Sequence, residues 1–323
     1  MLFPQSAPCQ TEIHSMIPKS RRRFLSELAT LPAFLSITSR LNAADPPGDW
    51  VFLDNGTLRL GIKRSSGAGI GWLSASGSQE NLLDHYDHGR LIQQSYYGRE
   101  DGSKWEEKPW RWNPVQGGDY KGSAAEVLSL THTATTLSAK IRPRNWAGGQ
   151  LLHDCLMEQQ IRMEGACAIV RFRFKYTGTE THPIVDHEVP AVFLNPRLIH
   201  LVHYQGNRPW TNAPLTRSQP GWPNESRSIP ESWAAYVNDQ GKGAGVFVPI
   251  AKEITCYRFG ASPDAPSACS YFAPVVRFAI TPGMDFSYEA AIAIGEPEEM
   301  RKTFAALRSK LAAPALPGTK TGP

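Results

Sequence analysis

Short segments in which apolar and polar residues alternate constrain the fold of this chain most. In the segment 168–176, Val170, Phe172 and Phe174 alternate with charged residues. A period of two gives a β-strand one buried face and one solvated face. The segment 156–163 precedes it across a Glu-Gly pair, so the two segments are predicted to form an antiparallel hairpin.

Segments of this type follow one another over most of the chain. The pair joined by Asp54-Asn-Gly56, a strong hairpin turn signal, is a second example. Residues 98–125 and 205–230 lack such periodicity and are predicted to be long loops, which in compact domains tend to carry function. The predicted strands cover residues 51–53, 57–62, 69–73, 81–83, 91–97, 126–131, 135–141, 156–163, 168–176, 199–204, 232–237, 243–249, 253–259, 271–280 and 286–294.

The only helical pattern lies near the C-terminus. Pro297 stands at the first position of a predicted helix, and Met300, Phe304 and Leu307 would share its apolar face. More than a dozen strands without crossover helices predict an all-β fold, an antiparallel sandwich of two large sheets with a short C-terminal helix. No repeat of fixed period is visible, which argues against a propeller or a solenoid.

The N-terminal segment is predicted to be an export signal rather than part of the fold. Ser20-Arg-Arg-Arg-Phe-Leu-Ser26 resembles the twin-arginine signal, and the apolar stretch after it is too short to span a membrane. We therefore predict a twin-arginine signal peptide at 1–44, a single β domain at 45–315 and a disordered tail at 316–323. The mature chain, with no membrane span, is expected in the periplasm or outside the cell.

Charge and cysteine content narrow the classes of partner and cofactor. A net charge of +4 in 323 residues implies no basic face, so nucleic acid is not an expected partner. The pairs Cys155/Cys167 and Cys256/Cys269 could be disulfides in an oxidising compartment or buried free thiols. No Cys-x-x-Cys spacing occurs, and we expect no metal and no other cofactor.

Residues 84–119 combine polar and aromatic side chains as a saccharide site would. The run from Asp87 to Gly98 holds a carboxylate, a histidine, an arginine, two glutamines and two tyrosines around only two aliphatic residues. A segment of this composition is not expected to build a core. Aromatic faces stack on the C–H faces of sugars while amides, carboxylates and guanidinium groups pair with hydroxyls.

The order of elements resembles the galactose-mutarotase-like β-supersandwich family, in a branch similar to exported proteins that accompany polysaccharide-degrading enzymes. The likeness lies in Asn55-Gly-Thr-Leu-Arg-Leu-Gly61, Gly69-Ile-Gly71, Tyr288-Glu-Ala-Ala-Ile-Ala-Ile-Gly295 and Asp186-His-Glu-Val-Pro-Ala-Val-Phe193. The resemblance implies that His187 is a catalytic acid. The family's C-terminal glutamate motif is not found in this chain, so Glu231 or Glu289 would have to replace that base.

Arg90, Tyr96 and Tyr97 are three further candidates for the site. Arg90 would anchor substrate charge, or else form a salt bridge with Asp84 or Asp87. Tyr96 and Tyr97 would point to opposite faces of a strand, so only one of them reaches the site, and we favour Tyr97 as an alternative base.

Other polar and aromatic residues near these candidates are predicted to be structural or are left without a role. His187 and Glu188 also lie on opposite faces, with Glu188 predicted to be a structural partner of an arginine. His85 and His88 match no metal motif, and solvated loop residues are the favoured interpretation. Six tryptophans, most of them in the two long loops, are too many for one core. The predicted catalytic residues are His187, Glu231 and Tyr97, and the predicted substrate-binding residues are Arg90, Gln93, Tyr96, Trp112, Gln116, Asp119, Trp210 and Trp222.

These residues predict an exported carbohydrate-active enzyme that uses acid/base catalysis on a poly- or oligosaccharide. Hydrolysis would require two carboxyl groups at the glycosidic bond, whereas elimination would require a uronate. The alternatives are an aldose 1-epimerase-like sugar mutarotase and a non-catalytic glycan-binding protein.

Overall fold

The computed structural model describes residues 48–265, 267–311 and 316–317. The predicted signal peptide, residues 1–44, lies outside the described residues, and so do residues 318–323 of the predicted tail. The described residues form one compact unit.

Ten strands of the described residues form the first sheet. They are β1 (Trp50–Asp54), β2 (Leu58–Lys63), β3 (Gly69–Ala75), β4 (Ile92–Ser95), β7 (Pro114–Val115), β10 (Arg144–Asn145), β13 (Val185–Leu194), β16 (Glu225–Ser228), β19 (Glu253–Phe259) and β20 (Cys269–Phe278). Eight run in the order β1-β2-β3-β4-β13-β20-β19-β16, while β7 pairs with β4 and with β10. A 3-10 turn, Arg64–Ser66, separates β2 from β3.

Nine strands form the second sheet in the described part of the chain. They are β8 (Glu126–His132), β9 (Thr136–Arg142), β11 (Cys155–Glu164), β12 (Cys167–Tyr176), β14 (His200–His203), β15 (Thr216–Ser218), β17 (Trp233–Val237), β18 (Gly243–Phe247) and β21 (Asp285–Gly295). Their order is β15-β14-β17-β18-β21-β12-β11-β9-β8. A separate hairpin consists of β5 (Glu100–Trp105) and β6 (Lys108–Arg111). The pairings between these strands are antiparallel.

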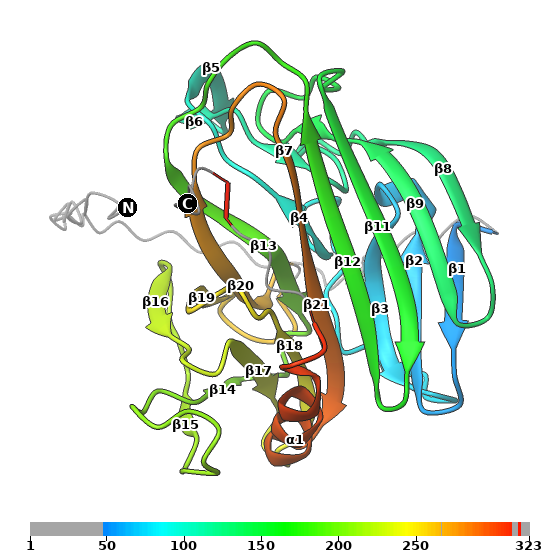
Figure 1. Cartoon of the computed structure of the whole chain (residues 1–323), viewed down its shortest axis with the longest axis vertical. Helices are drawn as coiled ribbons and strands as arrows, with labels where there is room; N and C mark the ends of the chain where they lie inside the picture. Colours follow the sequence, from blue (N-terminus) through cyan, green and yellow to red (C-terminus); the bar gives the residue numbers. More distant parts are fainter. Residues whose placement is uncertain (1–47, 266, 312–315, 318–323) are drawn as a thin grey trace, which may run out of the picture. The chain divides into compact units, whose positions relative to one another are not determined.

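The two sheets pack face to face around one main core. Figure 1 shows β11 and β12 crossing in front of β1, β2 and β3. In β12, Phe172 and Phe174 are fully buried while Arg171 beside them is exposed to solvent, so the predicted alternation is confirmed. The predicted hairpins at 54–56 and 156–176 are confirmed as well.

Both predicted long loops contain strands. Residues 98–125 include β5, β6 and β7, and residues 205–230 include β15 and β16. These strands are short, and most residues in them are partly or fully exposed, so they carry little of the alternation on which the prediction depended. The segment 81–83, predicted as a strand, contributes only an isolated bridge from Leu83.

Strand β13 runs between β4 and β20 and separates two neighbouring side chains. His187 lies opposite Val276 and faces the core between the sheets, where it contacts the rings of Phe278 and Tyr96. Its Nδ1 accepts the backbone N–H of Tyr97 at 3.1 Å, so Nε2 is the atom that donates to the Phe278 carbonyl, at 3.0 Å. Glu188 lies on the other face of the sheet.

The C-terminal helix α1 (Pro297–Leu307) forms as predicted. Met300, Phe304 and Leu307 are buried against the second sheet. A buried ion pair fixes the helix further, because Arg301 donates to both carboxylate oxygens of Glu231, at 2.9 and 2.5 Å. The same carboxylate accepts the indole N–H of Trp233 and the backbone N–H of Trp210.

Replacing Glu231 with alanine is expected to destabilise the protein by about 3–5 kcal/mol, because it leaves the Arg301 guanidinium buried without its partner. Urea unfolding of Glu231→Ala measures this loss. Glu298→Ala, an exposed substitution in the first turn of the same helix, is the control and should cost about 1 kcal/mol or less. Equal effects of the two substitutions would contradict a structural role for Glu231.

Burial lowers the pKa of His187 from 6.5 to about 4, so the folded protein resists protonating it. The stability that this histidine confers is complete above pH 6.5 and is lost as the pH falls towards 4, to a total of roughly 3 kcal/mol. Urea unfolding at pH 7, 5.5 and 4 should therefore show a steeper decline for the wild type than for His187→Gln. Parallel declines would mean that the imidazole is not buried in its neutral form.

Candidate functional site

Within the polar stretch 84–119, which predicts a saccharide site, residues 91–96 and 112–119 are buried. Gln93 is buried, donating to the carbonyls of His88 and Gly89 and accepting the N–H of Gly117. Gln116 is also buried and donates to the Gly67 carbonyl and to the side chain of Gln159. The expectation that this segment builds no core is wrong, because amide side chains here pair with one another and with the backbone.

Three more predicted substrate-binding residues have structural surroundings. Tyr96 is fully buried, stacks on Phe174 with ring centroids 4.2 Å apart, and donates its hydroxyl hydrogen to Gln94. Trp112 is buried and stacks on His182 at 4.0 Å. Asp119 caps a turn by accepting two backbone N–H groups, at 2.9 and 2.8 Å. These contacts leave the three side chains no open face for a ligand.

The outer face of the first sheet, directed away from the core, carries a different group of residues. Glu188 lies opposite Ser95 of β4 and Val275 of β20, and it is half-buried. The phenol of Tyr271 donates to its Oε1 at 2.5 Å. The hydroxyls of Tyr97 and Ser95 lie close enough to this carboxylate to favour its ionised form. We call Glu188, Ser95, Tyr97 and Tyr271 the Glu188 cluster.

The protonation of the cluster follows from its burial. Loss of solvation raises the pKa of Glu188 above the 4.5 of an ordinary glutamate, and the three hydroxyl donors oppose this effect. Burial raises the pKa of Tyr97 and of Tyr271 well above 10, and the charge of Glu188 adds to it. The phenols are therefore hydrogen donors at neutral pH, and the carboxyl group is the member that gains or loses a proton.

Aromatic rings continue from the cluster across the same face. Tyr271 packs against Phe193 at 4.6 Å and against Tyr257 at 4.5 Å. Trp222 in turn meets Tyr257 edge to face at 4.9 Å. Of the predicted tryptophans, Trp222 is thus connected to the cluster through Tyr257. Trp210 instead packs on Phe247 at the end of the second sheet that carries α1.

Arg90 forms the salt bridges that were the alternative to substrate binding. Its guanidinium lies 3.5 Å from Asp84 and 3.5 Å from Asp87, and it donates to the Ser267 carbonyl at 2.7 Å. Its positive charge also interacts electrostatically with Tyr257, the ring that contacts both Tyr271 and Trp222. Burial raises the pKa of Asp84 to about 6, in spite of this arginine. The guanidinium borders the site and is held by protein groups.

The cysteines and the possible metal ligands of the described residues form no second candidate site. Cys155, Cys167, Cys256 and Cys269 are buried free thiols, so the disulfide alternative is not realised. Across residues 48–265, 267–311 and 316–317, His, Cys, Asp and Glu side chains form no group of three or more with the spacing of a metal site. Among the same residues, no helix has the length and hydrophobicity needed to cross a bilayer.

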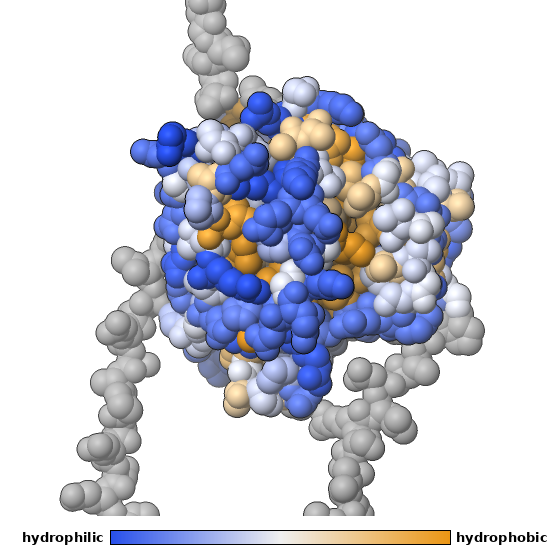
Figure 2. All heavy atoms as spheres, turned by 90° about the horizontal axis from the view of Figure 1, so that it is seen from below, coloured by the Kyte–Doolittle hydropathy of each residue, from blue (hydrophilic) through white to orange (hydrophobic). Residues whose placement is uncertain are grey.

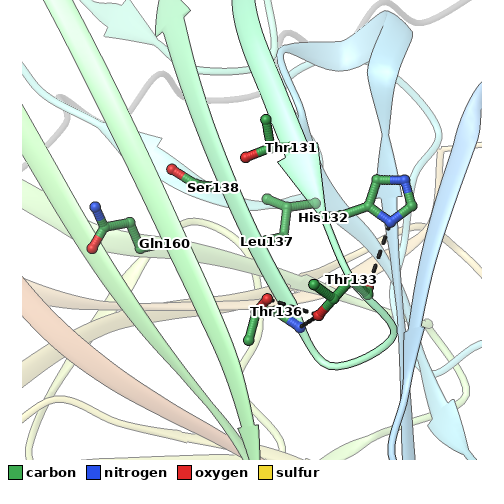
Figure 3. A pocket seen from close by; sticks show the side chains of 7 residues that line it. All are labelled: Thr131, His132, Thr133, Thr136, Leu137, Ser138 and Gln160. Atoms are coloured by element: carbon green, nitrogen blue, oxygen red, sulfur yellow. Dashed lines mark hydrogen bonds between the residues drawn. The ribbon is translucent and has the colours of Figure 1, made fainter.

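A surface hollow of about 310 Å³ lies on the second sheet, away from the Glu188 cluster. Figure 3 shows its side chains on β8, β9 and β11, where Thr133 and Thr136 hydrogen-bond to each other at the hairpin tip. It holds no carboxylate, and its one titratable side chain, His132, is exposed at the rim. It is lined by Thr131, His132, Thr133, Thr136, Leu137, Ser138 and Gln160.

One of the three predicted catalytic side chains belongs to the Glu188 cluster. Tyr97 is a member, whereas His187 faces the core behind the sheet and Glu231 is buried beneath α1. Their catalytic roles remain predictions, and neither side chain reaches the outer face. The prediction that Glu188 is a structural partner of an arginine overlooks its place next to an inward-facing histidine on a strand, which indicates an outward carboxylate.

This chain is similar to known proteins in structure but not in sequence. No family model and no curated protein sequence matches the chain. A galactose mutarotase related enzyme from Lactobacillus acidophilus aligns over 76% of this chain and 97% of its own, at 12% identity and a TM-score of 0.51. A galactose mutarotase-like protein from Lactobacillus casei aligns over 76% of this chain and 99% of its own, at 9% identity and 0.48. A 4-α-glucanotransferase from Thermococcus litoralis aligns over 76% and 37%, at 11% identity and 0.43.

Of these three, the Lactobacillus acidophilus structure has a TM-score above 0.5, and at 12% identity the likeness concerns the fold alone. It agrees with the two large antiparallel sheets and the single short helix of the described residues. The predicted resemblance is confirmed at that level: this chain has the galactose-mutarotase-like β-sandwich fold.

Proposed function

We propose that the protein is a carbohydrate-active enzyme that interconverts the anomers of a sugar, with Glu188 as the general base. The observation that carries this proposal is the Glu188 cluster itself. It joins one carboxyl group of raised pKa to phenols that stay protonated, with Tyr271 at 2.5 Å. Opening a sugar ring at the anomeric carbon requires a base for the anomeric hydroxyl and an acid for the ring oxygen.

The cluster supports this reaction better than hydrolysis or elimination. Acid/base hydrolysis uses two carboxyl groups on either side of the bond, whereas the described partners of Glu188 are all hydroxyls. Elimination from a uronate requires a cation to stabilise the charge that develops. Arg90, which borders the site, is already paired with Asp84 and Asp87. Anomeric interconversion requires neither a second carboxyl group nor a cation.

Two further observations, a similar structure and a set of aromatic rings, support the proposal. The Lactobacillus acidophilus protein that shares the fold is described as a galactose mutarotase related enzyme, a name of the same reaction class. The rings of Phe193 and Tyr257, which both pack against Tyr271, would supply the stacking surface that sugars require. The twin-arginine pattern at residues 20–26 would place this activity in the periplasm or outside the cell.

Replacing Glu188 with glutamine is expected to slow anomer interconversion about 100-fold or more, because the amide keeps the shape but cannot accept the proton. Polarimetry on freshly dissolved α-glucose and α-galactose measures the rate. Wild-type activity should rise as the pH increases through a value above 4.5, since the ionised carboxylate is the base.

Glu253→Gln is the matched control, because Glu253 lies on the same sheet opposite Val275 and is exposed. It should retain the wild-type rate. Wild-type protein that accelerates neither sugar, or a Glu188→Gln variant with full activity, would rule out the assignment.

A further inference from the structure

Beside the Glu188 cluster, the outer face of the first sheet exposes two large aromatic side chains that touch each other. Trp222 is 53% exposed and Phe259 is 38% exposed, and their ring centroids lie 5.3 Å apart. Tyr257 contacts Trp222 edge to face, with ring centroids 4.9 Å apart. Leaving this much aromatic surface in water is unfavourable, so a contiguous exposed group of this kind indicates a binding surface.

The loop that carries Trp222 is held in place. The N–H of Gly221 donates to the side chain of Glu225 at 2.8 Å, and the amide of Asn224 donates to the Thr255 hydroxyl at 2.9 Å. Thr255 belongs to β19, so the loop is tied to the same sheet that carries the cluster. Trp222 is therefore presented in a defined position, and binding to it would require little ordering.

A continuous row of rings connects this surface with the carboxyl group. From Trp222 the contacts pass to Tyr257 at 4.9 Å and from Tyr257 to Tyr271 at 4.5 Å. The hydroxyl of Tyr271 then reaches Glu188 at 2.5 Å. A ligand with its reacting end at Glu188 would meet Trp222 only if it extended beyond one sugar ring along this row.

The row indicates an uncharged ligand. Its members are phenyl, phenol and indole groups without formal charge at neutral pH, because burial raises the pKa of Tyr257 and Tyr271 well above 10. The guanidinium whose charge acts on Tyr257 is that of Arg90, which Asp84 and Asp87 already neutralise. A uronate or sulfate group on the ligand would find no compensating cation in these contacts.

We infer that the substrate is the reducing end of a neutral oligosaccharide, with its next sugar units stacked on Trp222, Phe259 and Tyr257. This inference rests on the proposed function for the identity of the reacting end. The aromatic subsite itself is independent of catalysis, because it depends only on the exposed rings and their link to the cluster.

Calorimetric titration of the Glu188→Gln variant of the full chain tests the subsite without turnover. The ligands are glucose, galactose and mannose and their α- and β-linked oligomers of two to five units, with galacturonic acid oligomers as the charged comparison. At least one neutral oligomer should bind about tenfold more tightly than its own monosaccharide, and Trp222→Ala should abolish that difference. Trp222→Phe should restore much of it, whereas Leu128→Ala, an exposed apolar side chain on the other sheet, should change nothing.

The outcomes separate this inference from the proposed function. Chain-length-dependent binding without anomer interconversion by the wild type would support the subsite and overturn the reaction. Interconversion of monosaccharides with no oligomer bound more tightly, or with Trp222→Ala unaffected, would overturn the subsite and leave the reaction in place. Preference for galacturonic acid oligomers would overturn the assignment to neutral chains. A dimer in sedimentation that Trp222→Ala dissociates, with saccharide binding unchanged, would show that the surface binds another copy of the protein instead.

Discussion

The position of β13 between β4 and β20 is the constraint on which the proposed site depends. Antiparallel pairing on both sides fixes its register, and the two-residue period then assigns His187 to the core and Glu188 to the outer face. A shift of one residue would exchange them, burying a carboxyl group among aromatic rings. The hydrogen bonds of His187 to Tyr97 and Phe278 hold the register from inside.

The buried amides give the same region its rigidity. Gln116, which follows β7, accepts the backbone N–H of Gln94 in β4 and donates to Gln159 in β11. The side chain of Gln94 also donates to the backbone carbonyl of Glu158 in β11. Each of these bonds satisfies a buried polar group that would otherwise be unpaired. Figure 2, a view from the end where α1 and β14 lie in Figure 1, shows apolar patches separated by hydrophilic side chains on that surface. Hydrophilic residues in this protein therefore occur inside as well as outside, and polarity alone does not locate the site.

Strands and helices that are marked by a pattern within a few neighbouring residues could be predicted from the sequence. Alternation identified β12, the Asn-Gly turn identified the β1–β2 hairpin, and Pro297 marked the start of α1. Strand β13 lacked such a signal because Pro190 and the irregular register between Glu188 and Val192 interrupt its alternation.

The site itself could not be predicted from local patterns. Glu188 meets Tyr97 from about ninety positions earlier and Tyr271 from about eighty later, and only the strand order brings them together. Composition pointed instead to Gln93 and Gln116, because an amide that binds a sugar and an amide that satisfies the backbone look alike in sequence. The same holds for Glu231, whose carboxylate serves an interior arginine.

Carbon-13 NMR of the glutamate side-chain carboxyl groups, with the Glu188 signal assigned by its absence in Glu188→Gln, measures the protonation of the cluster directly. We expect its resonance to titrate above pH 4.5 in the free protein, because burial disfavours the ionised form. Addition of a sugar that the enzyme interconverts should move both the resonance and its pKa. An ordinary pKa near 4.5 together with a resonance that no saccharide shifts would show that Glu188 is not the acid/base group of a sugar site.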